Sequence, residues 1–236
     1  MKLSILMPVY NEAATLNYAV KRVLDVAYPC EVELVLVDDG STDGSADIVS
    51  HIDDPRVVRG AHQSNRGKGA ALETAAGLAT GDYVIICDAD LEYSPGEIPS
   101  LLQPVIAGDA KVVFGTRTFG SHTAYSFWYV MGNWGVTMAA NVLYNSWLSD
   151  IETCFKLMPL SMYRALDLRQ HGFGVEAEIT GKLLKAGIRP YEVPVSYKAR
   201  GREEGKKLTW RDGVEALWIL CQIRFGNRSA PLGLSK

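Results

Sequence analysis

Short apolar runs alternate with helical patterns along the first half of the chain. The apolar runs are continuous rather than alternating, which is typical of strands that are covered on both faces. They lie at residues 3–10, 32–39, 55–60, 82–89 and 110–116. The helical patterns between them begin near Thr15, Gly44, Lys68 and Pro95. Strand–helix alternation predicts an α/β fold with right-handed crossovers and a mainly parallel sheet.

The second half of the chain has a different pattern. We expect a strand at 153–159, a helix at 176–185 and a strand at 189–197. A charged, glycine-bearing loop at 198–207 then leads to an amphipathic helix at 210–224. The remaining tail is expected to fray.

A long uncharged segment lies between these two halves. Residues 118–149 contain no Asp, Glu, Lys or Arg, and 126–148 is long enough to span a bilayer. A polar stripe nevertheless recurs along it at Asn133, Thr137, Asn141 and Asn145. An apolar stripe runs along Phe127, Met131, Trp134, Met138 and Val142. The segment is predicted to be an amphipathic helix, either buried on one side or lying at a membrane interface, with an ordinary core helix as the alternative.

Composition narrows the class of protein. The chain has 236 residues, 47% of them hydrophobic, and a formal net charge of −3, which suits one large globular domain or one domain with an appendage. Its mild acidity argues against a nucleic-acid partner. The cysteines are scattered without a CxxC pair, which is typical of reduced thiols in a cytosolic protein. The N-terminus predicts a first strand rather than a signal peptide.

Candidate chemistry gathers where the predicted strands end. Ligands of parallel sheets bind beyond the carboxyl ends of the strands. Polar side chains cluster at these ends: Tyr10, Asn11 and Glu12, then Asp38 and Asp39, then Asp88, Asp90 and Glu92. His51 and His62 lie near the third strand, and we expect no catalytic role for them.

The stretch DADLE carries acids at alternate positions, Asp88, Asp90 and Glu92. In an extended chain these side chains share one face, where they repel each other unless water or a cation intervenes. Carboxylate oxygens suit Mg²⁺ or Mn²⁺, and such sites use one or two protein carboxylates together with substrate phosphates. The stretch therefore predicts a metal site with a diphosphate substrate, or else a solvated strand end.

Common phosphate-binding loops are absent. The stretch after the first strand, PVYNEAATL, has no glycine, and the Gly–Lys pair at 67–68 lacks P-loop spacing. The chain is therefore neither an ordinary dehydrogenase nor a P-loop NTPase. In VDDGSTDGS, Asp38 and Asp39 have two alternative roles: hydrogen bonding to a base or ribose, or turn-making and helix capping.

Several motifs in order carry a family resemblance. PVYNE, VDDGSTDGS, NRGKGAA, DADLE, GTR and DIETCFK together resemble the inverting family 2 glycosyltransferases. Within that family the chain is similar to the polyprenyl-phosphate (dolichol-phosphate) sugar synthases. The resemblance implies one GT-A-like, Rossmann-type nucleotide-diphospho-sugar transferase domain at 1–225, with a tail at 226–236. Its nucleotide-sugar half would be about 1–117, and its acceptor and membrane-facing half 118–225.

The resemblance also implies roles for particular residues. Substrate binding would fall to Pro8, Tyr10, Glu12, Asp38, Asp39, Lys68, Asp88, Lys156 and Lys206. The catalytic set would be Asp88, Asp90, Arg117, Asp150 and Arg200. Asp90 and Glu92 would bind Mg²⁺ or Mn²⁺, although the family often has Gln where this chain has Glu92. The uncharged helix lacks the basic residue that the family often places there to bind the lipid phosphate.

The implied reaction transfers mannose or glucose from GDP-mannose or UDP-glucose to polyprenyl phosphate. The protein would be cytoplasmic and bound peripherally to the inner face of the membrane. Its contacts would be the charged loop at 198–207 and Trp210, Leu217, Trp218 and Leu220. A lipid phosphate has a second pKa of about 6, so it attacks without a catalytic base.

Two alternatives to this reaction stay open. A hydroxyl acceptor would need a base, for which Asp150 and Glu152 are candidates. A non-catalytic nucleotide-sugar-binding subunit is the other.

Overall fold

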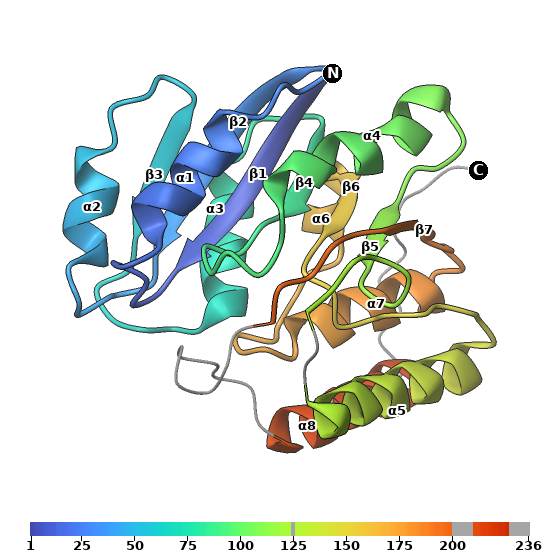
Figure 1. Cartoon of the computed structure of the whole chain (residues 1–236). Helices are drawn as coiled ribbons and strands as arrows, with labels where there is room; N and C mark the ends of the chain where they lie inside the picture. Colours follow the sequence, from blue (N-terminus) through green and yellow to red (C-terminus); the bar gives the residue numbers. More distant parts are fainter. Residues whose placement is uncertain (124–125, 200–209, 227–236) are drawn as a thin grey trace.

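The computed structural model describes residues 1–123, 126–199 and 210–226 (Figure 1). Strands in this part of the chain are β1 Lys2–Val9, β2 Glu31–Asp38, β3 Val57–Ala61, β4 Tyr83–Ile86, β5 Val113–Thr116, β6 Lys156–Pro159 and β7 Tyr191–Pro194. The helices are α1 Leu16–Leu24, α2 Ser45–His51, α3 Lys68–Leu78, η1 Pro95–Glu97, α4 Ile98–Ala107, α5 Phe127–Tyr144, α6 Leu160–Ala165, α7 Val175–Lys185 and α8 Trp210–Phe225. The predicted order of elements is confirmed, and α6 is a short helix that the pattern did not predict.

The strands form one sheet in the order β3-β2-β1-β4-β6-β5-β7. β1 pairs in parallel with β2 and β4, β2 with β3, and β5 with β7. β6 is antiparallel to both of its neighbours, β4 and β5. The prediction of a mainly parallel α/β sheet is therefore confirmed, with one reversed strand in its middle.

The strands are apolar because both faces of the sheet are covered. In β1, Leu3, Ile5, Leu6 and Met7 have no solvent exposure. Helix α3 packs on β1 and β2, and α6 packs on β4 and β6. Figure 1 shows α1 in front of the sheet and α3 behind it. Complete burial of consecutive residues explains why these runs are continuous rather than alternating.

The reversal of β6 decides which residues reach the edge where the parallel strands end. The parallel strands β1, β2, β4 and β5 all end at one edge, at the lower side of the sheet in Figure 1. Because β6 runs the opposite way, its first residue, Lys156, and the loop before it lie at that same edge. Residues 145–155 therefore join the loops that follow the parallel strands.

Helix α5 turns Asn133, Thr137 and Asn141 of its polar stripe toward the protein, whereas Asn145 follows the helix and is exposed. Thr137 and Asn141 are buried, whereas Trp128 is 78% exposed and Val142 is 76% exposed. The Asn141 side chain donates to the Leu148 carbonyl at 2.8 Å and accepts from the Leu148 amide at 2.8 Å. The predicted amphipathic helix is confirmed, with its apolar stripe on the outside.

Helix α8 packs beside α5 and α7 at one end of the molecule (Figure 1). Trp218 is 63% exposed and Leu217 is 36% exposed, but Leu220 is fully buried. The prediction that Leu220 is a membrane contact is therefore wrong, because this side chain faces the core. The side chain of Trp210 lies outside the described residues. None of the helices in the described ranges is long and apolar enough to cross a membrane.

A buried carboxylate, Glu33, lies near the start of β2, at the edge of the sheet opposite to the one where the parallel strands end. Its Oε1 accepts from the Ser4 hydroxyl and the Thr80 amide, both at 2.6 Å. Its Oε2 accepts from the Thr80 hydroxyl and the Lys2 ammonium, both at 2.7 Å. Burial raises the pKa of Glu33, but the hydrogen bonds from Lys2, Ser4 and Thr80 outweigh burial and lower the pKa to about 2. This network joins β1, β2 and the turn before β4.

We expect Glu33→Gln to lower the free energy of unfolding by roughly 2–3 kcal/mol at pH 7, because the charge-assisted hydrogen bonds are lost. A folded-state pKa of about 2, below the ordinary 4.5, gives stability that is present above pH 4.5 and is lost as pH falls toward 2. Urea unfolding at pH 7 and pH 3 checks this. The difference between variant and wild type should shrink at pH 3.

Glu31→Gln is the matched control, since Glu31 is an exposed residue of the same strand and lies 3.9 Å from the Lys2 ammonium. We expect this surface change to alter stability by less than about 0.5 kcal/mol. An equal loss in both variants, or a Glu33→Gln effect that does not depend on pH, would contradict the assignment.

Candidate active site

A pocket of about 300 Å³ opens at the edge where the parallel strands end. Its walls come from the loops after β1, β2 and β4, the start of α3, the loop before β6, the start of α7 and the segment after β7. The sequence-predicted residues in its lining are Pro8, Tyr10, Glu12, Asp39, Lys68, Asp88, Asp90, Glu92, Arg117 and Glu152, the last of these predicted as a candidate base. One cavity therefore gathers candidates that are spread over more than a hundred residues of sequence.

Other predicted residues lie elsewhere. Asp38, Asp150 and Lys156 are buried next to the pocket but do not form its lining. Arg200 and Lys206 lie outside the described residues. The roles implied for all of these residues stay predictions.

The stretch VDDGSTDGS shapes the loop that follows β1. The Ser41 hydroxyl accepts from the Asn11 amide at 3.0 Å, and the Ser45 hydroxyl accepts from the Glu12 amide at 2.9 Å. Asp43 accepts from the Ala13 amide at 3.0 Å. These contacts hold residues 10–13, which carry Tyr10 and Glu12, at the mouth of the pocket.

The two aspartates of this stretch have different surroundings. Asp39 Oδ1 contacts His62 Nδ1 at 2.6 Å and accepts from the Arg66 amide at 2.9 Å. Asp39 Oδ2 accepts from the Gly67 amide at 2.7 Å. Asp39 thus organises the loop 62–67. Asp38 accepts from the Ser41 amide at 3.2 Å through Oδ2.

Glycine in NRGKGAA permits a close backbone approach. The Gly69 amide donates to the His171 carbonyl at 2.7 Å. A Cβ at Gly69 would lie 1.8 Å from the Gln170 carbonyl oxygen, so any side chain there would displace the 170–171 backbone. This contact seats residues 172–176, which form one wall of the pocket, against the start of α3.

The acids of DADLE meet in a turn rather than along a strand. β4 ends at Ile86, and Leu91 has a left-handed backbone with φ of 64°. The Glu92 amide donates to Asp90 Oδ1 at 3.0 Å. The prediction of an extended chain through Glu92 is therefore wrong, although all three acids do line the pocket.

Lys68 lies between two carboxylates. Its ammonium is 2.8 Å from Asp88 Oδ2 and 2.6 Å from Glu176 Oε1. Burial lowers the pKa of Lys68, but the charges of Asp88 and Glu176 outweigh burial and raise it well above the usual value. Lys68 is therefore a permanent cation that fixes Asp88 at the end of β4 against α7.

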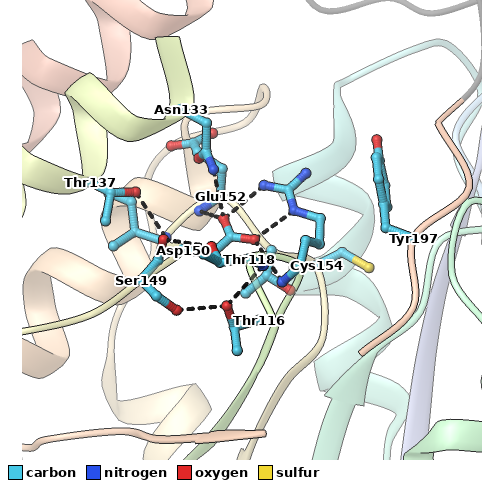
Figure 2. A network of polar contacts seen from close by, with 12 residues as sticks. Thr116, Thr118, Asn133, Thr137, Ser149, Asp150, Glu152, Cys154 and Tyr197 are labelled. Carbon is cyan, nitrogen blue, oxygen red and sulfur yellow. Dashed lines mark hydrogen bonds and ion pairs between the residues drawn. The ribbon is translucent and has the colours of Figure 1, made fainter. Parts of the chain in front are cut away.

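Asp150 is the centre of a buried polar network (Figure 2). Its Oδ2 accepts from Arg117 Nε at 2.6 Å, and its Oδ1 accepts from Arg117 Nη2 at 2.7 Å and from Asn133 Nδ2 at 3.2 Å. The Glu152 amide also donates to Asp150 Oδ1, at 3.2 Å. Burial raises the pKa of Asp150, but Arg117 outweighs burial and lowers it. A carboxylate this engaged is a poor proton acceptor.

Arg117 is held from two sides. Opposite Asp150, its guanidinium lies 5.0 Å from the centre of the Tyr197 ring, which is a cation–π distance. The Tyr197 hydroxyl donates to Glu92 Oε2 at 2.6 Å. Glu92, Tyr197 and Arg117 therefore form a continuous wall from the acidic turn to Asp150.

Glu152 brings a second carboxyl to this wall. Its Oε1 is buried, and within the described part of the chain it has no hydrogen-bond partner. Burial, followed by the charge of Glu176, raises the pKa of Glu152 to about 7. Lys156 is fully buried, its ammonium donates to the Ile151 carbonyl at 2.8 Å, and burial lowers its pKa to about 8. Its described contacts support the loop rather than the pocket.

The chemistry available here is that of a cation and diphosphate site beside a polar cavity. Asp88, Asp90 and Glu92 supply hard oxygen atoms, and Lys68 and Arg117 supply positive charge. In residues 1–123, 126–199 and 210–226, no group of three or more His, Cys, Asp or Glu side chains is arranged to hold a metal ion. Two carboxylates are nevertheless a common protein contribution to a Mg²⁺ site that substrate phosphates complete.

Sequence reasoning missed several residues of the lining. These are Asn65, Tyr93, Cys154, Phe173, Glu176 and Tyr197. Asn65 and Cys154 belong to motifs that were recognised, so the motif itself was the available signal. Glu176 and Tyr197 carry no local signal, because only the packing of α7 and the path after β7 bring them to the pocket.

Known proteins resemble this chain in sequence. An undecaprenyl-phosphate mannosyltransferase from Micrococcus luteus is 28% identical over 246 residues, which cover 96% of this chain and 100% of that protein. An undecaprenyl-phosphate 4-deoxy-4-formamido-L-arabinose transferase from Proteus mirabilis is 38% identical over 121 residues. That alignment covers 49% of this chain and 36% of the Proteus protein, so the chain spans about a third of that relative's length.

Solved structures agree on the fold. Glucosyl-3-phosphoglycerate synthase from Mycobacterium tuberculosis, in complex with Mn²⁺, UDP and glucosyl-3-phosphoglycerate, has a TM-score of 0.68 at 20% identity. The likeness covers 93% of this chain and 80% of that one. S. aureus TarS 1-349 in complex with UDP-GlcNAc has a TM-score of 0.65 at 15% identity. The likeness covers 94% of this chain and 66% of the TarS chain. The predicted GT-A-like fold is confirmed.

The family of this chain is shown by a family model that matches most of its sequence. The model described as glycosyl transferase family 2 matches residues 4–166, which include the loops after β1, β2 and β4 and the loop before β6. This match covers more than half of the chain. The resemblance predicted from the motifs is therefore confirmed, and the chain belongs to glycosyl transferase family 2 and is a glycosyltransferase.

Proposed function

We propose that the protein transfers a hexose, mannose or glucose, from GDP-mannose or UDP-glucose to polyprenyl phosphate at the cytoplasmic face of the membrane. The observation that carries this proposal is helix α5, which links the pocket to an exposed apolar surface. Asn133 on its polar side donates to Asp150, which holds Arg117 in the pocket wall. On its outer side Trp128 and Trp134 are exposed. The full-length similarity to an undecaprenyl-phosphate mannosyltransferase supports the same acceptor.

The donor is assigned to the half of the chain at about 1–117. Pro8, Tyr10, Glu12 and Asp39 line the part of the pocket nearest β1 and β2, and we assign them to the nucleoside. Asp90 and Glu92 would hold Mg²⁺ or Mn²⁺, since both line the pocket and offer carboxylate oxygens. A bound ion would compensate the charge that develops on the leaving nucleoside diphosphate.

The acceptor is assigned to the half at 118–225 together with Arg117, the last residue of the other half. The bidentate contact with Asp150 and the ring of Tyr197 hold the Arg117 guanidinium in the wall of the pocket. A cation fixed in this way attracts and orients an anionic acceptor phosphate. Such a phosphate is already a nucleophile at neutral pH, so no side chain needs to remove a proton.

A second candidate function is transfer to a soluble hydroxyl acceptor, which requires a base. The described geometry favours Glu152 over Asp150 for that role. Arg117 lowers the pKa of Asp150 against the effect of burial, whereas burial and Glu176 raise the pKa of Glu152 to about 7, which suits a base. A hydroxyl-transferring enzyme would therefore depend on Glu152.

A radiolabel assay tests the proposed acceptor. Purified protein is incubated with MnCl₂, polyprenyl phosphate in detergent and either GDP-[¹⁴C]mannose or UDP-[¹⁴C]glucose, and the product is extracted into organic solvent. We expect label in the organic phase with one of the two donors. Label in a neutral water-soluble product with glycerol or glucose as acceptor, separated from the anionic donor by anion exchange, would favour the hydroxyl alternative. No transfer to any acceptor would favour a non-catalytic subunit.

The metal assignment is tested by Asp90→Ala in calorimetry with MnCl₂ and UDP or GDP. Removing one of two carboxylate ligands should weaken Mn²⁺-dependent nucleotide binding by at least about tenfold, because the ion loses a charged oxygen. Asp47→Ala, on α2 away from the pocket, is the control. Equal affinity in Asp90→Ala and wild type would sink the assignment.

The membrane assignment is tested by co-sedimentation with anionic liposomes at low salt. The double variant Trp128→Ser/Trp218→Ser removes exposed aromatic side chains from α5 and α8. We expect the partition coefficient onto the liposomes to fall by at least about tenfold, because the apolar area of the two Trp side chains no longer enters the membrane interface. Tyr18→Ser, an exposed aromatic on α1, should leave binding unchanged. Wild-type protein that stays in the supernatant would contradict membrane binding.

A further inference from the structure

One side of the pocket is rich in carboxyl groups. Asp88 comes from the turn after β4, Glu152 from the loop before β6 and Glu176 from the start of α7. Lys68 is the cation that contacts Asp88 and Glu176, and its ammonium is shared between them. Three carboxyl groups therefore meet one directly contacting lysine here, and Lys156 and Arg117 act on Glu152 through their charge alone.

Two oxygen atoms on this side have no hydrogen-bond partner within the described residues. They are Asp88 Oδ1 and Glu152 Oε1, and both are buried. Buried polar atoms in native proteins nearly always have a partner, so an unpaired acceptor in a pocket indicates a ligand that donates hydrogen bonds. Both residues line the same cavity.

The charge of this side decides which part of a nucleotide sugar fits it. A phosphate carries negative charge and accepts hydrogen bonds, so Asp88, Glu152 and Glu176 would repel it. The hydroxyl groups of a hexose are neutral and donate hydrogen bonds. The acidic side therefore suits the sugar, while the cation-bound diphosphate belongs at Asp90.

We propose that Glu152 and Asp88 determine sugar specificity by accepting hydrogen bonds from hydroxyl groups of the transferred hexose. The inference rests on the proposed function, because it takes a nucleotide sugar as the donor. It assigns to Glu152 a role in ground-state recognition of the sugar rather than in proton transfer.

The Asp88 carboxylate and the backbone of Glu152 are both held in place before the ligand arrives. Asp88 Oδ2 is 2.8 Å from the Lys68 ammonium, which leaves Oδ1 directed elsewhere. The Glu152 amide donates to Asp150 Oδ1, and Asp150 is fixed in turn by Arg117. Groups fixed by such contacts discriminate between hydroxyl positions because they do not move to follow a displaced donor.

The experiment compares nucleotide with nucleotide sugar in calorimetry. Wild type and Glu152→Ala are titrated in MnCl₂ with UDP and UDP-glucose, and with GDP and GDP-mannose. A hydrogen bond to a charged group predicts an approximately ten- to hundredfold loss of affinity for the nucleotide sugar, with free-nucleotide affinity unchanged. Glu73→Ala, an exposed change on α3, should alter neither affinity.

Monodeoxy donors identify the hydroxyl that is read. The donor that lacks this hydroxyl should bind wild type less tightly than the parent nucleotide sugar does. The two donors should bind Glu152→Ala with the same affinity. Such loss of discrimination is the signature of a direct contact, since a structural defect would weaken all donors alike.

Folding of the variants is checked by thermal unfolding. The groups that face Glu152 are Glu176 and Asp150, which are acidic, and Lys156 and Arg117, which are basic. With a folded-state pKa of about 7 against an ordinary 4.5, ionised Glu152 costs stability as pH rises through this interval. Glu152→Gln should therefore unfold at an equal or higher temperature than wild type at pH 8, so this variant supplies a folded test protein.

Each outcome decides the inference. Loss confined to nucleotide sugars supports it. Equal loss for free nucleotide and nucleotide sugar overturns it, and so does unchanged sugar affinity with reduced turnover, which would mark Glu152 as a base. A wild type that binds neither nucleotide sugar would overturn the proposed function along with the inference.

Discussion

The buried ion pair between Asp150 and Arg117 is the contact on which the arrangement of residues 118–225, which we assign to the acceptor, depends. Asp150 has no solvent exposure, so its charge needs a partner, and Arg117 provides two parallel hydrogen bonds. The same carboxylate accepts from Asn133 on α5. One anion therefore joins the end of β5, the polar side of α5 and the loop before β6, and it turns the apolar side of α5 outward.

The reversed strand β6 explains how two halves of the chain form one pocket. The loops after β1, β2 and β4 bring the residues that we assign to the nucleotide and the ion. An antiparallel β6 adds the loop that carries Asp150, Glu152 and Cys154 to the same edge. The acidic side that we assign to the sugar lies where these two contributions meet, between Asp88 and Glu152.

Much of the site could be predicted because its residues follow strands directly. Tyr10 and Asp39 come just after apolar runs, and parallel strands must end at one edge, so their proximity follows from topology. The acidic turn shows the limit of this reasoning. The alternation of its acids predicted an extended chain, but Leu91 takes a left-handed backbone, and the acids converge through a turn instead.

The sequence by itself determined the order of elements, the buried strands and the amphipathic character of 127–144, because these depend on local periodicity and burial. Tertiary structure decided which side of α5 faces the protein, since Asn133 and Thr137 found partners in the loop before β6. It also decided that Glu176 and Tyr197 reach the pocket. These outcomes depend on contacts between residues that are distant in sequence. A local sequence pattern does not specify the partner that a polar side chain will contact.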